Sequence, residues 1–145
     1  MNRGVDKMKH LPYEPLRITS PFGPRNTGIQ GATKNHLGID IGADRKVATS
    51  LDGGNVYAIF DGKVIQSYFN KYRGWVVLID HGIINGKKIC TLSQHLKSMG
   101  VPVGVKVKAG DVIGRMGKTG IGSGLHLHFE VRENNIPVNP MNYLK

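Results

Sequence analysis

The chain of 145 residues is poor in cysteine, in acidic side chains and in long apolar runs. Its single cysteine, Cys90, excludes an intrachain disulfide, and we expect it to pack as a small apolar residue within a strand. No apolar stretch is long enough to cross a bilayer as a helix, so membrane insertion is not expected. The remaining composition, 39% hydrophobic, suits one globular domain with its own core.

The shortage of acidic residues leaves the chain strongly basic. It has 20 Lys and Arg against 10 Asp and Glu, which gives a formal net charge of +10. A charge of this size predicts an anionic partner. Nucleic acid is one candidate, but the basic residues are scattered, form no long run and have few aromatic residues among them. We therefore do not expect nucleic acid as the partner.

Composition and pattern predict an all-β fold. The chain has 20 glycines, 7 prolines and many short β-branched runs, and no long amphipathic helix stands out. Pro12 and Pro15 disfavour a helix in residues 1–17, which we expect to be an N-terminal arm before one domain at residues 18–145. Strands are predicted near residues 36–42, 55–60, 62–69, 74–84, 87–95, 105–107, 111–116 and 125–132.

The most informative motif is GLHLHFE, residues 124–130. His126 and His128 alternate with apolar Leu127 and Phe129, which is a strand pattern, so both imidazoles project from the face opposite the apolar residues. Their backbones would lie about 6.6 Å apart, close enough for the two side chains to converge on one metal ion or one substrate. From this motif alone, two exposed histidines on the polar face of a strand are an equally good interpretation.

A second motif, NHLGIDIGA at residues 35–43, carries His36 and Asp40. Gly38 and the β-branched isoleucines disfavour a helix here. On a straight strand the two side chains would be about 13 Å apart, so a bend or bulge near Gly38 is needed to bring them together. For this motif alone, a solvated histidine and an aspartate in a turn are the better interpretation. Taken with His126 and His128, the count becomes three histidines and one aspartate. Imidazole and carboxylate are donors that zinc accepts, and three protein ligands with an open water position form the catalytic zinc pattern.

A third candidate, His95, lies on a predicted hairpin. Asn85-Gly86 predicts a two-residue turn, which would pair Ile84 with Lys87 and Val76 with His95. His95 would then end the returning strand on a mostly polar face, which it would share with Thr91 and Ser93. The alternative is a surface histidine at the edge of the sheet. His81, just before the turn, is expected to be structural or simply exposed.

Taken together, these motifs resemble the lysostaphin/LytM-type zinc endopeptidases, which cut peptidoglycan cross-links. The family pattern is HxxxD, then a lone histidine in an H-L context, then HLHFE, and the chain has all three in order. The matches are HLGID at 36–40, QHL at 94–96 and HLHFE at 126–130, with further similarity in ITSPFGPR at 18–25, VYAIFDGKVI at 56–65 and VKAGDVIGRMGKTG at 107–120. The resemblance therefore covers most of the chain.

The resemblance implies an antiparallel sheet that forms the floor of a groove, in a fold of the barrel-sandwich or duplicated hybrid motif type. It implies a zinc ion, Zn2+, as cofactor, with His36, Asp40 and His128 as ligands. It also implies His95 and His126 as a catalytic pair that does not bind the metal.

The chain departs from the family at two positions. Ser93 stands where the family usually has an aromatic residue, and Leu125 where it usually has proline. Neither position supplies a ligand, so these departures bear on the groove and its specificity.

The function implied is a zinc-dependent endopeptidase that hydrolyses peptide cross-links of peptidoglycan through a metal-activated water. Peptidoglycan also suits the net charge of +10, because bacterial walls carry anionic polymers and peptide carboxylates. One alternative is a catalytically inert wall-binding or hydrolase-activating module of the same fold. Another is a basic nucleic-acid-binding β-domain. A metal assay separates both from the enzyme.

The first residues, MNRGVDKMKHLPYEP, are basic but have no apolar core, so they do not form a secretory signal. We expect synthesis in the cytoplasm and action on the cell wall. A phage or prophage hydrolase, released through a holin pore or carried on a virion, would explain both, and such a protein would be bacteriolytic.

Overall fold

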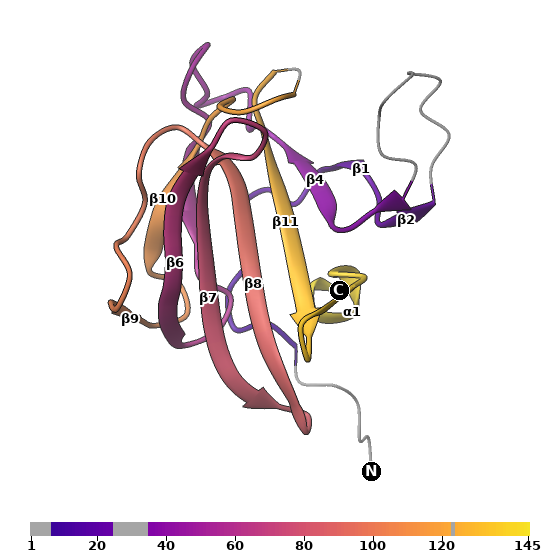
Figure 1. Cartoon of the computed structure of the whole chain (residues 1–145). Coiled ribbons are helices and arrows are strands. Elements are labelled where there is room, and N and C mark those ends of the chain that lie inside the picture. Colours follow the sequence, from indigo (N-terminus) through magenta and orange to yellow (C-terminus); the bar gives the residue numbers. More distant parts are fainter. Residues whose placement is uncertain (1–6, 25–34, 123) are drawn as a thin grey trace.

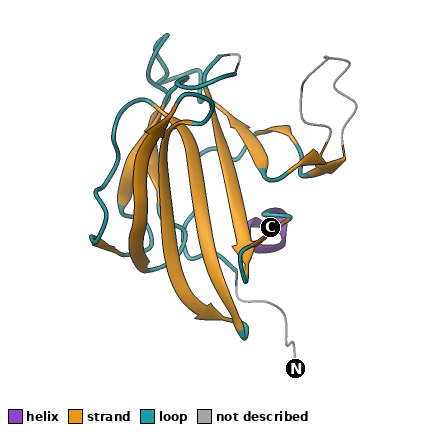
Figure 2. Ribbon diagram, viewed as in Figure 1, coloured by secondary structure: helices purple, strands orange, loops and turns teal. Residues whose placement is uncertain are grey.

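The computed structural model describes residues 7–24, 35–122 and 124–145, and this part of the chain consists mainly of strands and loops (Figures 1 and 2). The strands are β1 (Ile18–Ser20), β2 (Gly23–Pro24), β3 (Asn35–His36), β4 (Ile39–Gly42), β5 (Gly54–Tyr57), β6 (Gly62–Asn70), β7 (Gly74–Ile84), β8 (Lys87–Leu96), β9 (Lys106–Val107), β10 (Val112–Met116), β11 (His126–Glu133) and β12 (Ile136–Val138). One short helix, α1 (Met141–Leu144), follows them. The all-β prediction is confirmed.

One large antiparallel sheet dominates the molecule. Its strands lie in the order β1-β4-β11-β8-β7-β6-β9, with β12 beside β11, β10 beside β8 and β5 beside β10. Figure 1 shows the long strands β6, β7, β8 and β11 side by side. β2 and β3 form a separate two-stranded pair. Because β11 lies between β4 and β8, three segments far apart in sequence become neighbours in the middle of the sheet.

The hairpin of β7 and β8 forms as predicted around its turn. Asn85 and Gly86 have φ of 55° and 78°, and two positive values are what a type I′ turn requires. The turn matches the twist of the strands, and Ile84 pairs with Lys87.

At the far end of this hairpin the predicted pairing of Val76 with His95 is interrupted, because Gln94 and His95 together lie opposite Val76, between the pairs Trp75–Leu96 and Val77–Ser93. The register shifts by one residue between Trp75 and Val77, because β8 carries an extra residue there. His95 lies in this irregular segment with φ of 64°, an uncommon value for a residue other than glycine. Uniform pairing from the turn cannot predict such a bulge.

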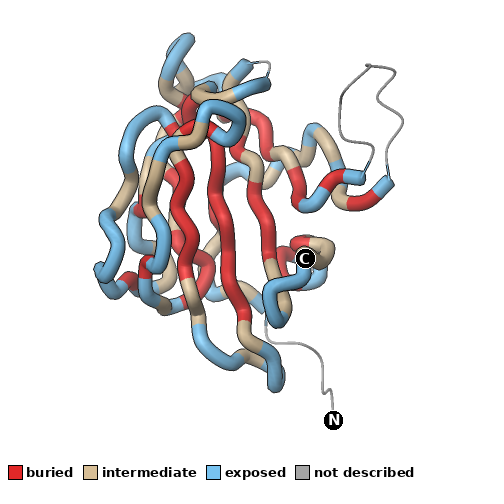
Figure 3. The backbone as a smooth tube through the Cα atoms, viewed as in Figure 1, coloured by how far each residue is buried: buried red, intermediate tan, exposed pale blue. Residues whose placement is uncertain are grey.

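The core lies on one face of the large sheet. Figure 3 shows buried segments along the middle of the long strands and exposed loops at their ends. Inward-facing side chains of four strands contribute Ile39, Ile41, Val56, Val77, Ile79, Leu127, Phe129 and Val131. A smaller buried cluster contains Val76, Leu78, Cys90 and Leu92. Cys90 is free and 4% exposed, which confirms that it packs as an apolar residue.

The first described residues pack against the sheet and the C-terminus. Met8 N–H donates to Tyr143 O (3.0 Å), and Tyr57 N–H donates to Pro12 O (2.9 Å). Tyr13 is buried, and its hydroxyl donates to Gly53 O (2.6 Å). Within the described ranges, no helix has the length and apolar character needed to cross a membrane.

Two other strand predictions need correction. The strand predicted at 55–60 ends at Tyr57, and residues 58–61 connect β5 to β6, which do not pair with each other. β5 pairs with β10, and β6 pairs with β7 and β9. The segment predicted at 36–42 is split into β3 and β4.

Candidate metal centre

The HLGID segment folds as two short strands joined by a bend at Leu37-Gly38, which confirms the bend predicted there. The bend places His36 Nε2 3.3 Å from Asp40 Oδ1. Gly38 permits it, because a Cβ at this position would lie 2.3 Å from the backbone oxygen of Phe129 on the neighbouring strand. The absence of a side chain at residue 38 therefore lets β4 and β11 approach.

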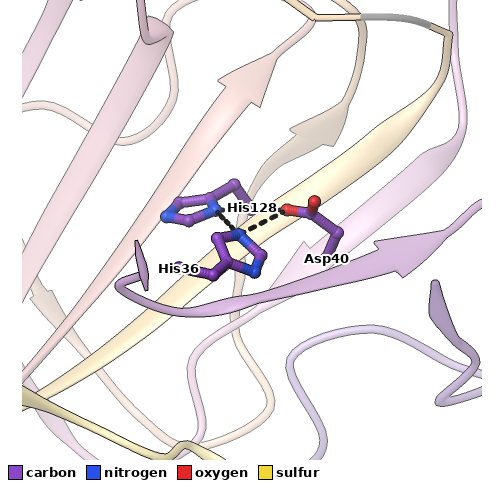
Figure 4. A group of neighbouring side chains, drawn as sticks. All are labelled: His36, Asp40 and His128. Atoms are coloured by element: carbon purple, nitrogen blue, oxygen red, sulfur yellow. Dashed lines mark hydrogen bonds and ion pairs between the residues drawn. The ribbon is translucent and has the colours of Figure 1, made fainter. Parts of the chain in front are cut away.

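β11 brings a second histidine to the same place. Leu127 and Phe129 are buried in the core, so His126 and His128 project from the opposite face, as predicted. His128 is paired in register with Asp40 of β4. Its Nδ1 lies 3.1 Å from Asp40 Oδ1 and 3.1 Å from His36 Nε2 (Figure 4).

These three atoms form a triangle whose size suits a metal ion. Its sides are 3.1, 3.1 and 3.3 Å. A tetrahedral zinc ion with bonds of about 2.0–2.2 Å holds neighbouring ligand atoms about 3.3–3.6 Å apart. Within the described residues, His36, Asp40 and His128 are the group of three whose ligand atoms come together in this way.

The outer contacts of the two imidazoles fix their tautomers. His36 Nδ1 lies 2.9 Å from Pro21 O, and a carbonyl oxygen only accepts, so Nδ1 carries the proton and donates. His128 Nε2 donates to the Glu130 carboxylate at 2.8 Å. In the neutral rings, His36 Nε2 and His128 Nδ1 therefore present lone pairs to the triangle. A cation is the natural occupant of a point faced by two lone pairs and a carboxylate.

Electrostatics in the triangle also favour positive charge. Burial raises the pKa of Asp40, but its contacts with the His128 and His36 rings outweigh it and hold that pKa well below its usual range. Burial lowers the pKa of His128, but its contacts with the carboxylates of Asp40 and Glu130 outweigh it and raise that pKa. Glu130 is 3% exposed and also accepts from Arg132 at 2.9 and 3.0 Å. The carboxylate that orients His128 is therefore itself held in place.

His95 and His126 lie beside the triangle. Their ring centroids are 4.7 Å apart, and His126 Nε2 is 4.0 Å from Asp40 Oδ1. His95 Nδ1 donates to Thr119 O at 2.7 Å, which leaves Nε2 as a proton acceptor. Burial lowers the pKa of His95, although the hydrogen bond to Thr119 opposes this effect. All five predicted site residues therefore meet in one place.

The five residues line a groove of about 720 Å³, whose wall also includes Tyr72 and Ile121. The prediction that His95 shares a face with Thr91 and Ser93 is wrong, because the bulge lets Gln94 and His95 line the groove together. Strict alternation along a strand would have turned one of these two away.

His81 is a structural histidine, as predicted. Its Nδ1 donates to Asp61 O at 2.9 Å, and its Nε2 lies 2.8 Å from the hydroxyl oxygen of Thr91. Burial lowers its pKa. Because both ring nitrogens have protein partners, the ring joins β7, β8 and the segment before β6.

The triangle of ligand atoms, the adjacent histidine pair and the groove define a candidate metal-dependent hydrolase. The sequence pattern of Peptidase family M23 matches residues 34–140, which is most of the chain. The chain belongs to this family of metallopeptidases, and the lysostaphin/LytM-type resemblance is confirmed.

Two curated relatives show the extent of the similarity. The DD-carboxypeptidase/endopeptidase Mpg of Neisseria meningitidis is 39% identical over 131 residues, 88% of this chain and 28% of the relative. The peptidoglycan DD-endopeptidase ShyC of Vibrio cholerae is 35% identical over 130 residues, 89% of this chain and 28% of the relative. The chain thus spans less than a third of the length of these relatives.

Two solved structures share the fold. A zinc-containing peptidase from Vibrio cholerae matches with a TM-score of 0.74 and 34% identity, over 96% of this chain and 40% of that one. The catalytic domain of the antimicrobial peptidase lysostaphin from Staphylococcus simulans matches with a TM-score of 0.70 and 28% identity, over 87% of this chain and 90% of that one.

Sequence reasoning did not find the residues that orient the histidines. The alternation that singled out His126 and His128 continues to Glu130 and Arg132 on the same strand face, so the strand period alone could have linked Glu130 to His128. Thr119 is 24 residues from His95, and no local pattern connects them.

Proposed function

We propose that this protein is a zinc endopeptidase that hydrolyses the peptide cross-links of bacterial peptidoglycan. The observation that carries the proposal is the triangle of His36 Nε2, Asp40 Oδ1 and His128 Nδ1, with both imidazoles held in the tautomer that binds a cation. Membership of Peptidase family M23 agrees with it.

Zinc is the proposed metal because the donor set suits it. Two imidazole nitrogens and one carboxylate oxygen are typical of catalytic zinc sites that keep a fourth position open. The similar peptidase from Vibrio cholerae is described as containing zinc. The backbone oxygen of Pro21 and the carboxylate of Glu130 would orient His36 and His128 as ligands from behind.

His95 and His126 are the proposed catalytic pair. Zinc held by the triangle would supply Lewis acidity and would lower the pKa of a water molecule to about 7. Each histidine of the pair has its Nδ1 next to a backbone oxygen, Thr119 O at 2.7 Å and Gly124 O at 3.2 Å, and so offers Nε2 as a proton acceptor. The pair can therefore accept a proton from water and return it to the leaving amine.

Peptidoglycan is proposed as substrate from the similar proteins and the charge. The relative ShyC is named a peptidoglycan DD-endopeptidase. The net charge of +10 favours association with a wall that carries anionic groups. The inert-module alternative is not favoured, because the triangle and the histidine pair are both complete.

The proposed bond is a peptide bond and not a glycosidic bond. Glycosidases need two carboxyl groups that flank the scissile bond. Of the groove residues, Asp40 belongs to the triangle, and Glu130 is paired with His128 and Arg132. The groove thus offers no pair of available acids among the residues that the structure describes.

Digestion of purified sacculi tests the proposal. The zinc-loaded protein should release new amino groups without new reducing sugar ends, and mass spectrometry of the fragments should locate the cleaved amide. A chelator should abolish the release, and added zinc should restore it. New reducing ends, or release that is indifferent to the chelator, would contradict the proposal.

We further propose that the protein is bacteriolytic, with a phage or prophage hydrolase as the expected type. The support is its similarity to lysostaphin, which is described as an antimicrobial peptidase. Purified protein added to whole bacteria should lower the turbidity of the suspension, whereas unchanged turbidity on cells whose isolated sacculi are cut would contradict the lytic role.

A further inference from the structure

Three arginine side chains line the groove beside the candidate metal centre. Arg17, Arg45 and Arg73 come from three separate segments, all line the groove and all are exposed. Within the described residues, none of them forms an ion pair with a carboxylate. The acidic groove residues, Asp40 and Glu130, are held by the triangle and by Arg132. The arginine charges are therefore available to a ligand.

Arg17 is held next to one of the catalytic histidines. Its Nη2 donates to Ala43 O at 2.9 Å, and its guanidinium lies across Gly42, where a Cβ would come within 2.4 Å of Nη2. Gly42 is paired in register with His126. The guanidinium therefore lies over the strand neighbour of His126, and the glycine leaves room for it.

Arg73 is tied to the other catalytic histidine. Its backbone oxygen accepts from His95 N–H at 2.8 Å, and its Nη1 donates to the Tyr68 hydroxyl at 3.1 Å. Arg17 precedes β1 and Arg73 precedes β7, whereas the histidine pair belongs to β11 and β8, between these strands in the sheet. The two arginines thus lie on either side of the histidine pair.

From this arrangement we propose that Arg17 and Arg73 form carboxylate subsites on the two sides of the scissile bond. The substrates would be cross-linked peptides with a free carboxylate on a residue next to the cleaved amide, preferred over peptides in which that group is amidated or absent. A guanidinium binds a carboxylate through two parallel hydrogen bonds, which gives it both affinity and orientation. This inference rests on the proposed endopeptidase function.

A matched pair of substrates tests the inference. Two cross-linked peptides, identical except that the residues on both sides of the scissile bond carry either free carboxylates or carboxamides, are cleaved by the zinc-loaded protein. We expect kcat/KM to be roughly 10- to 100-fold higher for the carboxylate, the size of a charge-assisted hydrogen bond. Arg17→Gln and Arg73→Gln should each move this ratio toward one. Arg17→Lys keeps the positive charge but loses the two parallel N–H donors of the guanidinium, so it should give an intermediate ratio.

Lys106→Gln is the matched control, because Lys106 lies on β9 at the opposite edge of the sheet and does not line the groove. It removes the same charge and should leave the ratio unchanged. If Arg17→Gln does not fold, the ratio measured for Arg73→Gln tests the carboxylate subsites instead. Equal cleavage of the two peptides by the wild type overturns the carboxylate subsites and leaves the endopeptidase intact. Failure to cleave either peptide or sacculi contradicts the proposed function itself.

Discussion

At the scale of single residues, the second nitrogen of each imidazole decides what that histidine can do. His36, His128 and His95 each donate one N–H to a fixed oxygen of the protein and turn the other nitrogen toward the groove. His81 has protein partners for both nitrogens and turns neither to the groove. Together with His126, whose Nδ1 lies 3.2 Å from Gly124 O, four histidines are thus available for chemistry, whereas His81 supports the sheet.

The histidine pair should be separable from the metal ligands. Alanine at His95 or His126 should leave zinc content near the wild-type value, because neither side chain is part of the triangle. Hydrolysis should fall about 10²- to 10⁴-fold, the usual loss when acid–base help is removed. Metal analysis and initial rates on sacculi measure the two effects.

His81→Ala is the control for this pair. It should retain zinc and most activity in the folded fraction, although the lost contacts to Asp61 and Thr91 lower stability. A well-folded His81→Ala protein without activity would mean that His81 takes part in the reaction.

Thr119 should support His95 through its side chain. Its hydroxyl donates to Leu96 O and accepts from Trp75 N–H at 3.1 Å, and its own carbonyl holds His95. Thr119→Val removes the hydroxyl and should lower the free energy of unfolding by about 1–3 kcal/mol, with a further loss of activity. Urea denaturation measures the first effect, and Thr119→Ser should restore both. A valine variant as stable and active as the serine variant would show that the hydroxyl is not needed.

At the scale of elements, the close approach of β4 and β11 depends on Gly38. Alanine there would place a Cβ 2.3 Å from Phe129 O, which is backbone and cannot move alone. We expect Gly38→Ala to lower stability by about 1–3 kcal/mol, as overpacking does, and to weaken metal binding because His36 and Asp40 flank the bend. Urea titration and zinc competition measure these effects. Wild-type values in both would mean that the close approach of β4 and β11 does not depend on Gly38.

The sequence predicted the elements with strong local signals. Residues 74–84 and 87–95 were expected as a hairpin, and β7 and β8 match them to within one residue. The turn residues Asn85 and Gly86 explain this success, since their positive φ is a local preference. Alternation likewise placed His126 and His128 on one face of β11.

The features that the sequence could not give depend on tertiary contacts. The bulge that turns His95 into the groove lies far from the turn, where β8 runs between β7 and β11, so the local preference of the turn residues does not predict it. The short strands β1 and β2 have too few residues for a periodic signal, and each pairs with a strand of the HLGID segment. The spacing of His36 and Asp40 showed that a bend was needed, but only the fold supplies its shape.

At the scale of the whole molecule, Asp52 should contribute to acid sensitivity. Hydrogen bonds from Arg115, Gly54 N–H and Lys97 lower its pKa to about 2, although burial opposes the shift. Because the folded pKa lies below the unfolded value of about 3.9, this stabilisation is complete above that value and is lost as the pH falls toward 2. Arg115 and Lys97 belong to β10 and to the segment after β8, so Asp52 joins distant parts of the chain.

Asp52→Asn tests this contribution. The wild type should be more stable than the variant at pH 6, and the difference in the free energy of unfolding should shrink between about pH 4 and pH 2. Urea titrations at several pH values measure it. A difference that does not change with pH would mean that the charge of Asp52 is not responsible.

The central claim is that His36, Asp40 and His128 together hold one zinc ion, and elemental analysis tests it most directly. Protein purified without added metal should contain about one zinc per chain, as a site with three protein ligands implies. His126→Ala should keep this zinc, whereas His36→Ala, Asp40→Ala and His128→Ala should each lose most of it. Full zinc occupancy in all three ligand variants would contradict the claim.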